Sequence, residues 1–454
     1  MSLNVVILAA GQGTRMHSEQ PKVLHTLGGK PMLAHCIDSA RQLNATQIIV
    51  VYGYGGEQVR AMFADDDIIW IQQAQQLGTG HAVQQAIPKL NNAPNSKTLI
   101  LYADVPLVRK TSLRALVDSD SDCALLTCAL EDPTGYGRII RDQQQQVIGI
   151  VEEKDADQTQ RAIKEINTGI LSADTRLLIE WLGQINNNNA QQEYYLTDCI
   201  ACAVAQGIAV EAFTCSDRAE VSGINDRVQL AQAENYYQMR TREQLMQQGV
   251  TLKDPASVYI EGTIEAEVDC EIEPSVSLRG TIKLGKNVVI GMNSVIINST
   301  IGQGTIIQPN SHIEAAEIGA DCEIGPFARI RPQTVLAEQV KIGNFVETKK
   351  STIGHSTKVN HLSYIGDAEL GNHTNIGAGT ICCNYDGANK HKTIIGNDVF
   401  IGSDTQLVAP VKIADGATIG AGSTITEDAP ANKLTLSRSK QNSVDHWQRP
   451  KKNN

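Results

Sequence analysis

The sequence has few aromatic residues and no long hydrophobic run. Phe, Trp and Tyr make up 4% of the 454 residues, although hydrophobic residues reach 41%. The first apolar stretch, Val5 to Ala10, is too short to span a membrane and lacks the basic leader of a signal peptide. We therefore expect a cytoplasmic protein without membrane segments, whose interior is built from stacked aliphatic side chains.

Basic residues and paired cysteines are also scarce. Acidic residues outnumber basic ones by 50 to 39, and the net charge of -11 argues against nucleic acid as a main partner. The ten cysteines show no repeated paired spacing, which argues against a disulfide framework and favours a reducing compartment. Cys199 and Cys202 lie in an expected helix without a second pair nearby, so buried thiols are favoured over a metal site.

Aliphatic residues recur mostly every six positions through the C-terminal half, and the spacing drops to five from Ile296 to Ile301 and from Ile313 to Ile318. The ladder comprises Leu284, Ile290, Ile296, Ile301, Ile307, Ile313, Ile318, Ile324, Ile330, Leu336, Ile342, Ile353, Val359, Ile365, Ile395, Ile401, Leu407, Ile413, Ile419 and Ile425. Glycine follows many of these rungs, which suits a short flat face followed by a tight corner. The period predicts a parallel β-helix, interrupted by a protruding polar loop at 382–390.

The N-terminal half alternates short apolar runs with helical patterns. The apolar runs are Asn4 to Ala10, Gln47 to Tyr52, Ile68 to Ile71, Thr98 to Tyr102 and Ala124 to Leu130. This alternation predicts a mostly parallel sheet covered by helices, with ligands beyond the carboxyl ends of the strands. We expect an α/β domain over 1–225, a linker helix over 226–250, and a β-helix domain with a polar tail over 251–454.

A glycine-rich string from Leu8 to Met16 directly follows the first expected strand. Its small residues allow backbone N–H groups to approach phosphate oxygens, and Arg15 and Lys22 supply cations for a triphosphate. A GxG turn alone is more often a tight turn than a nucleotide site, and the spacing fits neither the Walker nor the dinucleotide fingerprint. The longer string, with its downstream Pro21-Lys22, is more specific.

Three further segments extend that pattern. They are Gln73 to Ala82, Tyr102 to Pro106 and Gly135 to Arg138. Together the strings resemble the signature of the sugar-phosphate nucleotidyltransferases. With the β-helix included, essentially the whole chain resembles the bifunctional bacterial enzymes that acetylate glucosamine-1-phosphate and uridylylate the product. The resemblance implies a Rossmann-like nucleotidyltransferase domain, a left-handed β-helix of hexapeptide repeats and homotrimers with an acetyl site between subunits.

The resemblance also implies the residues of a uridyltransferase site. Leu8, Ala10, Gly11, Gln73, Gly78 and Thr79 would hold the uridine nucleotide of UTP, Lys22 would contact phosphate, and Tyr102, Ala103, Gly137, Glu152, Asn167 and Thr168 would surround N-acetylglucosamine-1-phosphate. Asp104 and Asn225 would ligate Mg²⁺, whose preferred ligands are hard oxygens. On sequence alone, Asp104 is equally consistent with a cap or a turn. Ala103 stands where the family usually has glycine. Mg²⁺, Arg15 and Lys22 would neutralise charge during in-line attack on the α-phosphorus.

A second site is implied within the β-helix. There His361 would be the catalytic base, since histidine titrates near neutrality and the sugar amine must lose a proton before it attacks a thioester. Arg331, Lys349, Tyr364, Asn375, Asn384 and Tyr385 would contact glucosamine-1-phosphate, and Ala378, Asn384, Tyr385, Ser403, Ala421 and Arg438 would contact acetyl-CoA. Taken singly, each polar residue on a β-helix exterior is better explained as solvated surface.

Two other classes of function compete with this interpretation. The chain could be a nucleotidyltransferase alone, with the β-helix acting as a trimerisation or regulatory scaffold. It could instead be a nucleic-acid-binding or scaffold protein. The combination of His361, Tyr364, the Asn384-Tyr385 insertion and Arg438 favours two activities, because a purely structural prism requires none of them. The acidic balance opposes nucleic acid.

Overall fold

The chain folds into two compact units, one ending at Tyr237 and the other beginning at Gln238. The computed structural model describes residues 2–11, 13–53, 55–63, 67–450 and 452. In this part of the chain, no helix is long and apolar enough to cross a membrane. Helix α8 (Arg227–Gln247) covers most of the helix expected over 226–250, and the division between the units falls inside it.

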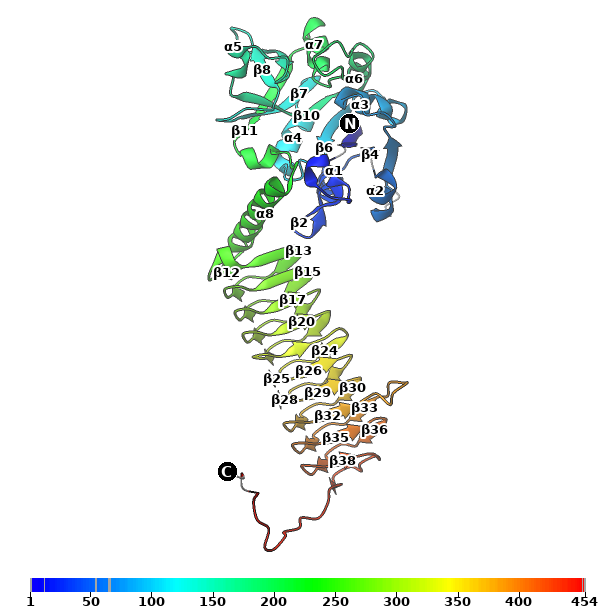
Figure 1. Ribbon diagram of the computed structural model, residues 1–454, viewed down its shortest axis with the longest axis vertical. Helices are drawn as coiled ribbons and strands as arrows, with labels where there is room; N and C mark the ends of the chain where they lie inside the picture. Colours follow the sequence, from blue (N-terminus) through cyan, green and yellow to red (C-terminus); the bar gives the residue numbers. More distant parts are fainter. Residues whose placement is uncertain (1, 12, 54, 64–66, 451, 453–454) are drawn as a thin grey trace. The chain divides into compact units, whose positions relative to one another are not determined.

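The N-terminal unit is an α/β sheet with helices on both faces (Figure 1). Its strands run in the order β11 (Val210–Cys215), β7 (Cys123–Ala129), β10 (Glu165–Asp174), β6 (Ser96–Tyr102), β1 (Ser2–Ala9), β4 (Gln47–Tyr52) and β5 (Ile68–Gln72). β8 (Arg138–Arg141) and β9 (Val147–Val151) form a hairpin beside β10, and β2 (Thr26–Leu27) pairs with β3 (Lys30–Pro31). The five expected strands are all present.

Successive side chains along a strand point to opposite faces of the sheet and pack into two separate hydrophobic cores. In β1, Val5 and Ile7 face one core while Val6 and Leu8 face the other. α1 (Met32–Gln42) and α4 (Lys110–Asp118) pack in the first core, and α3 (Thr79–Ala86), α6 (Thr175–Leu182) and α7 (Asp198–Ala205) pack in the second. The short helices α2 (Gly56–Met62) and α5 (Gln158–Arg161) complete the unit. β10 is antiparallel to β6 and β7, so the sheet is mostly, not wholly, parallel.

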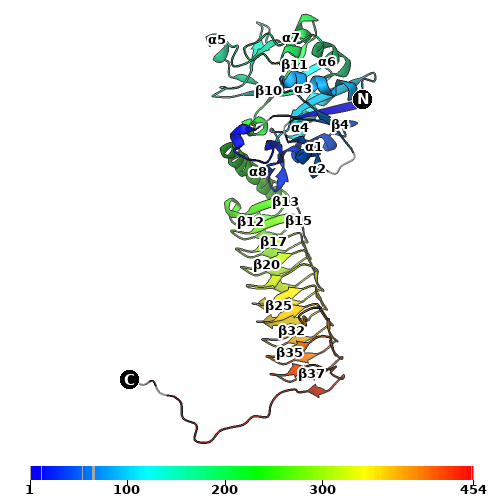
Figure 2. The same ribbon diagram turned by 45° about the vertical axis from the view of Figure 1, so that its right-hand side comes forward.

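The C-terminal unit is a parallel β-helix, as the six-residue period predicts (Figures 1 and 2). One sheet stacks β12 (Thr251–Leu252), β14 (Glu271–Ile272), β16 (Val289–Ile290), β19 (Ile306–Ile307), β22 (Glu323–Ile324), β25 (Lys341–Asn344), β28 (Lys358–His361), β31 (Asn375–Ile376), β34 (Phe400–Ile401), β37 (Thr418–Ile419) and β39 (Leu434–Thr435). The other faces contain β13 (Tyr259–Ala266), β15 (Ser277–Leu284), β17 (Val295–Ile297), β18 (Thr300–Ile301), β20 (His312–Glu314), β21 (Ala316–Ile318), β23 (Arg329–Ile330), β24 (Thr334–Leu336), β26 (Glu347–Lys349), β27 (Thr352–Ile353), β29 (Tyr364–Gly366), β30 (Ala368–Leu370), β32 (Ile381–Cys383), β33 (Thr393–Ile395), β35 (Gln406–Val408), β36 (Val411–Ile413) and β38 (Thr424–Ile425).

The length of each coil follows the spacing of the ladder. Hydrogen bonds between neighbouring coils join residues 17 or 18 apart in most of the β-helix. Across the polar insertion the separation rises to 25, as between Val399 and Thr374. The extra residues form a loop between β32 and β33, pinched by a bridge between Tyr385 and Lys390. The loop therefore leaves the stacking of the coils intact.

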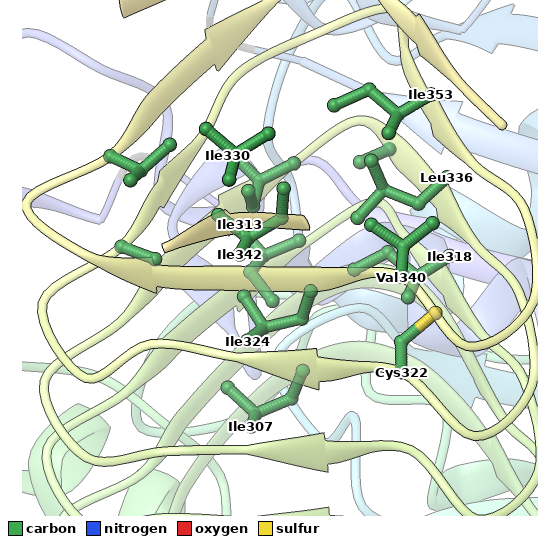
Figure 3. Packing of buried hydrophobic residues seen from close by; sticks show 14 of the residues in the cluster. Ile307, Ile313, Ile318, Cys322, Ile324, Ile330, Leu336, Val340, Ile342 and Ile353 are labelled. Atoms are coloured by element: carbon green, nitrogen blue, oxygen red, sulfur yellow. The ribbon is translucent and has the colours of Figure 1, made fainter. Parts of the chain in front are cut away.

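The aliphatic ladder points inward and forms continuous columns. Figure 3 shows Ile307, Ile324 and Ile342 stacked on one another, in register through the strand pairs β19–β22 and β22–β25. Each has a side chain with at most 1% exposure. A column of branched side chains at matched positions accounts for the recurrence of the six-residue spacing, because each rung buries its neighbours.

Truncating one rung tests this core. We expect Ile307→Ala to lower the free energy of unfolding by about 2–5 kcal/mol, because it leaves a cavity between two other isoleucines. Ile306 on the same strand is 41% exposed, so Ile306→Ala is a matched control expected to cost about 1 kcal/mol or less. Urea unfolding followed by circular dichroism measures both. Equal losses would contradict the inward assignment of Ile307.

Candidate active sites

A pocket opens at the carboxyl ends of β1 and β6, the edge where open α/β sheets bind ligands. Its volume is about 250 Å³. Its lining includes Leu8, Ala10, Gly11, Lys22, Gln73, Gly78, Thr79, Tyr102 and Asp104, all implied by the resemblance, together with Ala9, Val23, Gln76, Ala82 and Glu193. The fold thus gathers residues from five separate sequence segments around one cavity.

Lys22, Asp104 and Asn225 converge at one side of this pocket. Lys22 Nζ lies 2.6 Å from Asp104 Oδ2 and 3.0 Å from Asn225 Oδ1. The backbone holds Asp104 in place, because the N–H of Ile224 donates to its carbonyl oxygen at 2.8 Å. The carboxylate and amide oxygens face a shared cation position, which the ammonium group fills. This donor set of hard oxygens fits a divalent cation such as Mg²⁺.

A cluster of polar groups lies close to Tyr102. Gly169 packs so closely on the Tyr102 ring that an added Cβ would lie 2.6 Å from it. Gly137 has more room, since an added Cβ would lie 3.1 Å from Ile150 and 3.3 Å from the Glu152 carboxylate. The N–H of Asn167 donates to Gly137 O at 2.8 Å. Burial raises the pKa of the Glu152 carboxyl, although a 2.9 Å hydrogen bond from the Thr197 hydroxyl opposes the shift. Burial also raises the pKa of Tyr102, and the charge of Glu152 adds to this shift.

Seven of the implied residues do not line this pocket: Asn225, Gly137, Glu152 and Asn167, described above, and Arg15, Thr168 and Ala103. Arg15 is exposed in the turn Thr14–Met16. Thr168 donates its hydroxyl to the carbonyl of Leu126 at 2.7 Å and is mostly buried. Ala103 is fully buried in the hydrophobic core and donates its N–H to Leu8 O. Its methyl group therefore packs into the protein interior instead of facing the cation position.

A second group of implied residues lies at the ends of neighbouring strands in the β-helix. Arg331 follows β23, Lys349 ends β26, His361 ends β28 and Tyr364 begins β29. Glu347 pairs in register with Tyr364, and Lys349 pairs with Gly366. These residues are therefore carried by consecutive coils, which brings them to one side of the solenoid.

The orientation of the His361 ring is fixed by the preceding coil. Its Nδ1 lies 3.1 Å from Oδ1 of Asn344, which is its register partner on β25. Because the amide oxygen is an acceptor, Nδ1 donates the proton and Nε2 keeps a lone pair. The residue is exposed on the surface of the chain. His361 can therefore act as a base through Nε2.

Positive charge gathers at Lys349, on the coil that precedes His361. The ammonium groups of Lys349 and Lys390 lie close together, and this neighbouring charge is the chief reason that the pKa of Lys349 is lowered. Desolvation and the guanidinium of Arg331 lower it further, while Asp367 acts in the opposite direction. Arg331 also donates to Glu347 Oε1 at 2.7 Å. Neighbouring cations of this kind are relieved by a bound anion such as a phosphate.

The polar loop adds an ordered amide to the site. Asn384 Nδ2 donates to the buried carboxylate of Asp367 at 2.5 Å and approaches the Tyr364 hydroxyl at 3.4 Å. Tyr385 is 61% exposed and donates its hydroxyl to the Gly387 carbonyl. Further along the loop, Asp386 accepts from the N–H groups of Ala388 and Asn389, and these bonds lower its pKa. The loop is thus held in a defined shape.

Residues implied for acetyl-CoA follow one corner of the later coils. Ala378, Ser403 and Ala421 each follow a glycine of the ladder. The close packing of Gly377 on Ser403 and of Gly402 on Ala421 stacks these corners. Arg438 donates from Nη1 to the Ala421 carbonyl at 2.7 Å, which ties the tail to this corner. Asn375 lies instead on β31 beside Lys358 and lines a separate groove that includes His373.

Sequence reasoning missed three residues that support the second site. Asn344 orients His361, Asp367 holds Asn384, and Lys390 adds a cation beside Lys349. The length of a coil could have predicted the contact with Asn344, because this residue precedes His361 by 17 residues, which is one coil. The position of Lys390 could not be found in this way, since it depends on how the insertion loop folds back.

Comparisons with known proteins find matches in both units of the chain. Residues 5–163 match the MobA-like NTP transferase domain, residues 255–347 the GMPPB C-terminal domain, and residues 392–427 the bacterial transferase hexapeptide (six repeats) family. The Bifunctional protein GlmU of Stutzerimonas stutzeri is 52% identical over 454 residues, covering 100% of both chains. Those of Cupriavidus pinatubonensis and Chromobacterium violaceum are 52% and 50% identical, covering 99% of each chain.

Proposed function

The chain belongs to the GlmU family of bifunctional proteins, and on this basis we propose how its two units divide two reactions. It is both a nucleotidyltransferase and an acetyltransferase. We assign acetyl transfer from acetyl-CoA to glucosamine-1-phosphate to the β-helix. The N-terminal unit then transfers a uridylyl group from UTP to N-acetylglucosamine-1-phosphate and releases pyrophosphate, giving UDP-N-acetylglucosamine.

One observation carries this assignment: each unit assembles its own cluster of charged and polar side chains. Lys22, Asp104 and Asn225 meet beside the N-terminal pocket, while His361 and Lys349 lie on consecutive coils of the β-helix. A nucleotidyltransferase with a passive scaffold would need the first cluster alone. The relatives named as bifunctional also match over the β-helix, so the scaffold alternative is not favoured.

In the uridylyl reaction, the residues position substrates and balance charge. We propose that Lys22 moves from Asp104 to the phosphates of UTP and that Arg15 reaches them from its exposed turn. Glu152, Asn167 and Gly137 line the sugar side, where a buried carboxyl group can accept hydrogen bonds from sugar hydroxyls. Positioning and electrostatic stabilisation account for catalysis, since no covalent nucleophile is required.

We propose Mg²⁺ as the cation held by Asp104 and Asn225. When bound, a divalent cation would neutralise negative charge on the phosphate oxygens. The two protein oxygens already face a common point, so the chain needs little rearrangement to present them. Release of Lys22 from this point would leave its ammonium available for the substrate.

In the acetyl reaction, His361 removes the proton from the sugar amine. Asn344 fixes the tautomer, so that Nε2 is the basic atom. Lys349, Lys390 and Arg331 bind the phosphate and so hold the amine beside this base. Ala378, Ser403, Ala421 and Arg438 mark the path of acetyl-CoA along the corner of the coils.

We further propose that the chain acts as a homotrimer in the cytoplasm. An apolar corner of the β-helix supports the assembly: Phe327, Phe345 and Leu362 are at least 50% exposed, and the two phenylalanine rings stack 5.4 Å apart. Such a surface favours contact with another copy, and it adjoins His361 in the sequence. The cysteines are free thiols in the described part of the chain, which suits a reducing compartment.

Mass spectrometry of reaction mixtures tests the proposed function. The full mixture contains glucosamine-1-phosphate, acetyl-CoA, UTP and Mg²⁺, and each is omitted in turn. We expect UDP-N-acetylglucosamine from the full mixture and none without acetyl-CoA. We expect the product again when N-acetylglucosamine-1-phosphate replaces both glucosamine-1-phosphate and acetyl-CoA. If N-acetylglucosamine-1-phosphate is converted but glucosamine-1-phosphate with acetyl-CoA is not, the β-helix is a scaffold and not an acetyltransferase.

Removing Lys390 is expected to weaken binding of glucosamine-1-phosphate. A hydrogen bond to a charged group contributes about 1.5–3 kcal/mol, so Lys390→Ala should raise KM by about 10- to 100-fold with a smaller effect on kcat. Steady-state kinetics of acetyl transfer measure this. Lys392→Ala is the matched control, because that lysine in the same loop pairs with Glu369. Equal changes in both variants would indicate a general effect on the loop.

A further inference from the structure

The side chain of His391 binds that of Asp386 within the polar loop between β32 and β33. Its Nε2 lies 2.6 Å from Oδ2 of Asp386, and the two side chains are 33% and 45% exposed. An ionised carboxylate can only accept a hydrogen bond, so Nε2 carries a proton in this contact whether the ring is neutral or charged. The imidazole is therefore the donor, and its charged form adds an ion pair.

The same carboxylate also holds the turn at the tip of the loop. Its Oδ1 accepts from the N–H groups of Ala388 and Asn389 at 2.8 and 2.6 Å. The bond from Asn389 and the contact with His391 lower the pKa of Asp386, so the carboxylate stays ionised near neutral pH. One oxygen of Asp386 thus holds the tip of the loop, and the other is bound by a residue on the arm that leads back to β33.

The two arms of the loop are short, and the loop protrudes from the coils beside β33 (Figure 1). The N–H of His391 donates to the carbonyl oxygen of Asn384 at 2.8 Å, and Tyr385 and Lys390 form an isolated bridge. A short ribbon of two strands is marginally stable by itself. The side-chain bond between its arms therefore contributes to holding one shape.

The shape of this loop sets the positions of side chains that we expect to contact both acetyl-transfer substrates. Tyr385 lies next to Asp386 in sequence, and Lys390 lies next to His391. Lys390 also lies beside Lys349, where it adds a cation to the proposed phosphate site. Neighbouring residues of an extended arm point to opposite sides. A fixed His391 ring therefore also fixes the side to which the Lys390 ammonium points.

We propose that His391 is a positioning residue of the acetyl site, which binds Asp386 and so holds the polar loop in the shape that presents Tyr385 and Lys390 to the substrates. This inference rests on the proposed function, in which the β-helix transfers the acetyl group. His391 acts through Asp386 and need not touch either substrate. Its contribution is therefore to substrate binding and not to the removal of the proton from the sugar amine.

Two substitutions at His391 separate this role from a merely structural one. His391→Phe keeps an aromatic ring but removes the donor. We expect it to raise KM for both glucosamine-1-phosphate and acetyl-CoA by about 3- to 10-fold, the effect of losing one hydrogen bond to a partly exposed charged group, and to change kcat by less than about twofold. His391→Gln places an amide N–H near the position of Nε2, and we expect both KM values to stay within about twofold of those of the unmodified protein.

Steady-state kinetics of acetyl transfer measure these effects, and uridylyl transfer by the same samples shows that the chain is folded. His355→Phe is the matched control, because it makes the same exchange at another corner of the β-helix, where the ring meets that of His373. Asp386→Ala removes the acceptor, so His391→Phe added to Asp386→Ala should change KM by less than about twofold. Unchanged KM values in His391→Phe would overturn the inference, as would an equal defect in His391→Gln or additive effects in the double variant.

Limited proteolysis reports on the loop without reference to activity. Trypsin cuts after lysine, and Lys390 and Lys392 lie in this segment. We expect cleavage there to be about threefold faster or more in His391→Phe than in the unmodified protein, because local opening exposes the chain to the protease. Mass spectrometry of the fragments identifies the cut, and equal rates would overturn the inference. If the unmodified protein transfers no acetyl group, the proposed function fails instead, and the cleavage rates still show whether His391 holds the loop.

Discussion

Replacing His361 with alanine is expected to lower acetyl transfer by about 10²- to 10⁴-fold, the usual contribution of a general base. The sugar amine is mostly protonated near neutral pH and cannot attack a thioester until it loses a proton. Nε2 of His361 is the basic atom available for this step, because Nδ1 is committed to Asn344. Steady-state acetyl transfer, with uridylyl transfer measured on the same sample, gives the effect.

The β-helix provides its own control for this substitution. His355 lies on another corner of the coils, where its ring meets that of His373 at 5.5 Å. We expect His355→Ala to leave acetyl transfer unchanged, since it removes an imidazole from the same solenoid without touching the proposed site. Acetyl transfer close to the unmodified rate in His361→Ala would rule out the role of base. Loss of uridylyl transfer as well would point to unfolding.

The fold could be predicted from the sequence because its signals are local and repeated. Each rung of the ladder, such as Ile324, is followed by a corner, and the next rung comes six residues later, so the period alone gives the β-helix. Five strands of the N-terminal unit also appeared as apolar runs, but β11, which pairs parallel with β7, was not among them. β10 did not appear as such a run either, because it pairs antiparallel with β6 and β7 and its sequence alternates with polar residues such as Asn167 and Ser172.

The side chains that support the sites were harder to predict, because they act across long separations. Asn225 meets Lys22 across 203 residues, and only the resemblance to known enzymes placed the two together. Even over five residues, the sequence does not reveal that the His391 ring binds Asp386, because this contact depends on how the insertion folds. Ala103 shows the converse: next to Asp104 in sequence, its methyl group is buried in the core and faces away from the cation position.

Replacing Asp104 with alanine is expected to lower uridylyl transfer by about 10³-fold or more, while acetyl transfer stays unchanged. Asp104 supplies the charged oxygen beside the pocket and holds Lys22 at 2.6 Å. Its loss removes an anionic ligand for the cation and leaves the Lys22 ammonium in contact with Asn225. The negative charge that develops on the phosphate oxygens in the transition state is then poorly neutralised.

The two activities, measured on one preparation of Asp104→Ala, decide whether the sites are independent. Asp67→Ala serves as the matched control, because Asp67 is an exposed carboxylate of the same unit that pairs with Arg41 at 2.7 Å. We expect that control to retain both activities, since exposed ion pairs contribute little to stability. If Asp104→Ala lost acetyl transfer to the same extent as uridylyl transfer, the assignment of one reaction to each unit would be wrong. A selective loss means that the cation position of the N-terminal unit serves one reaction alone.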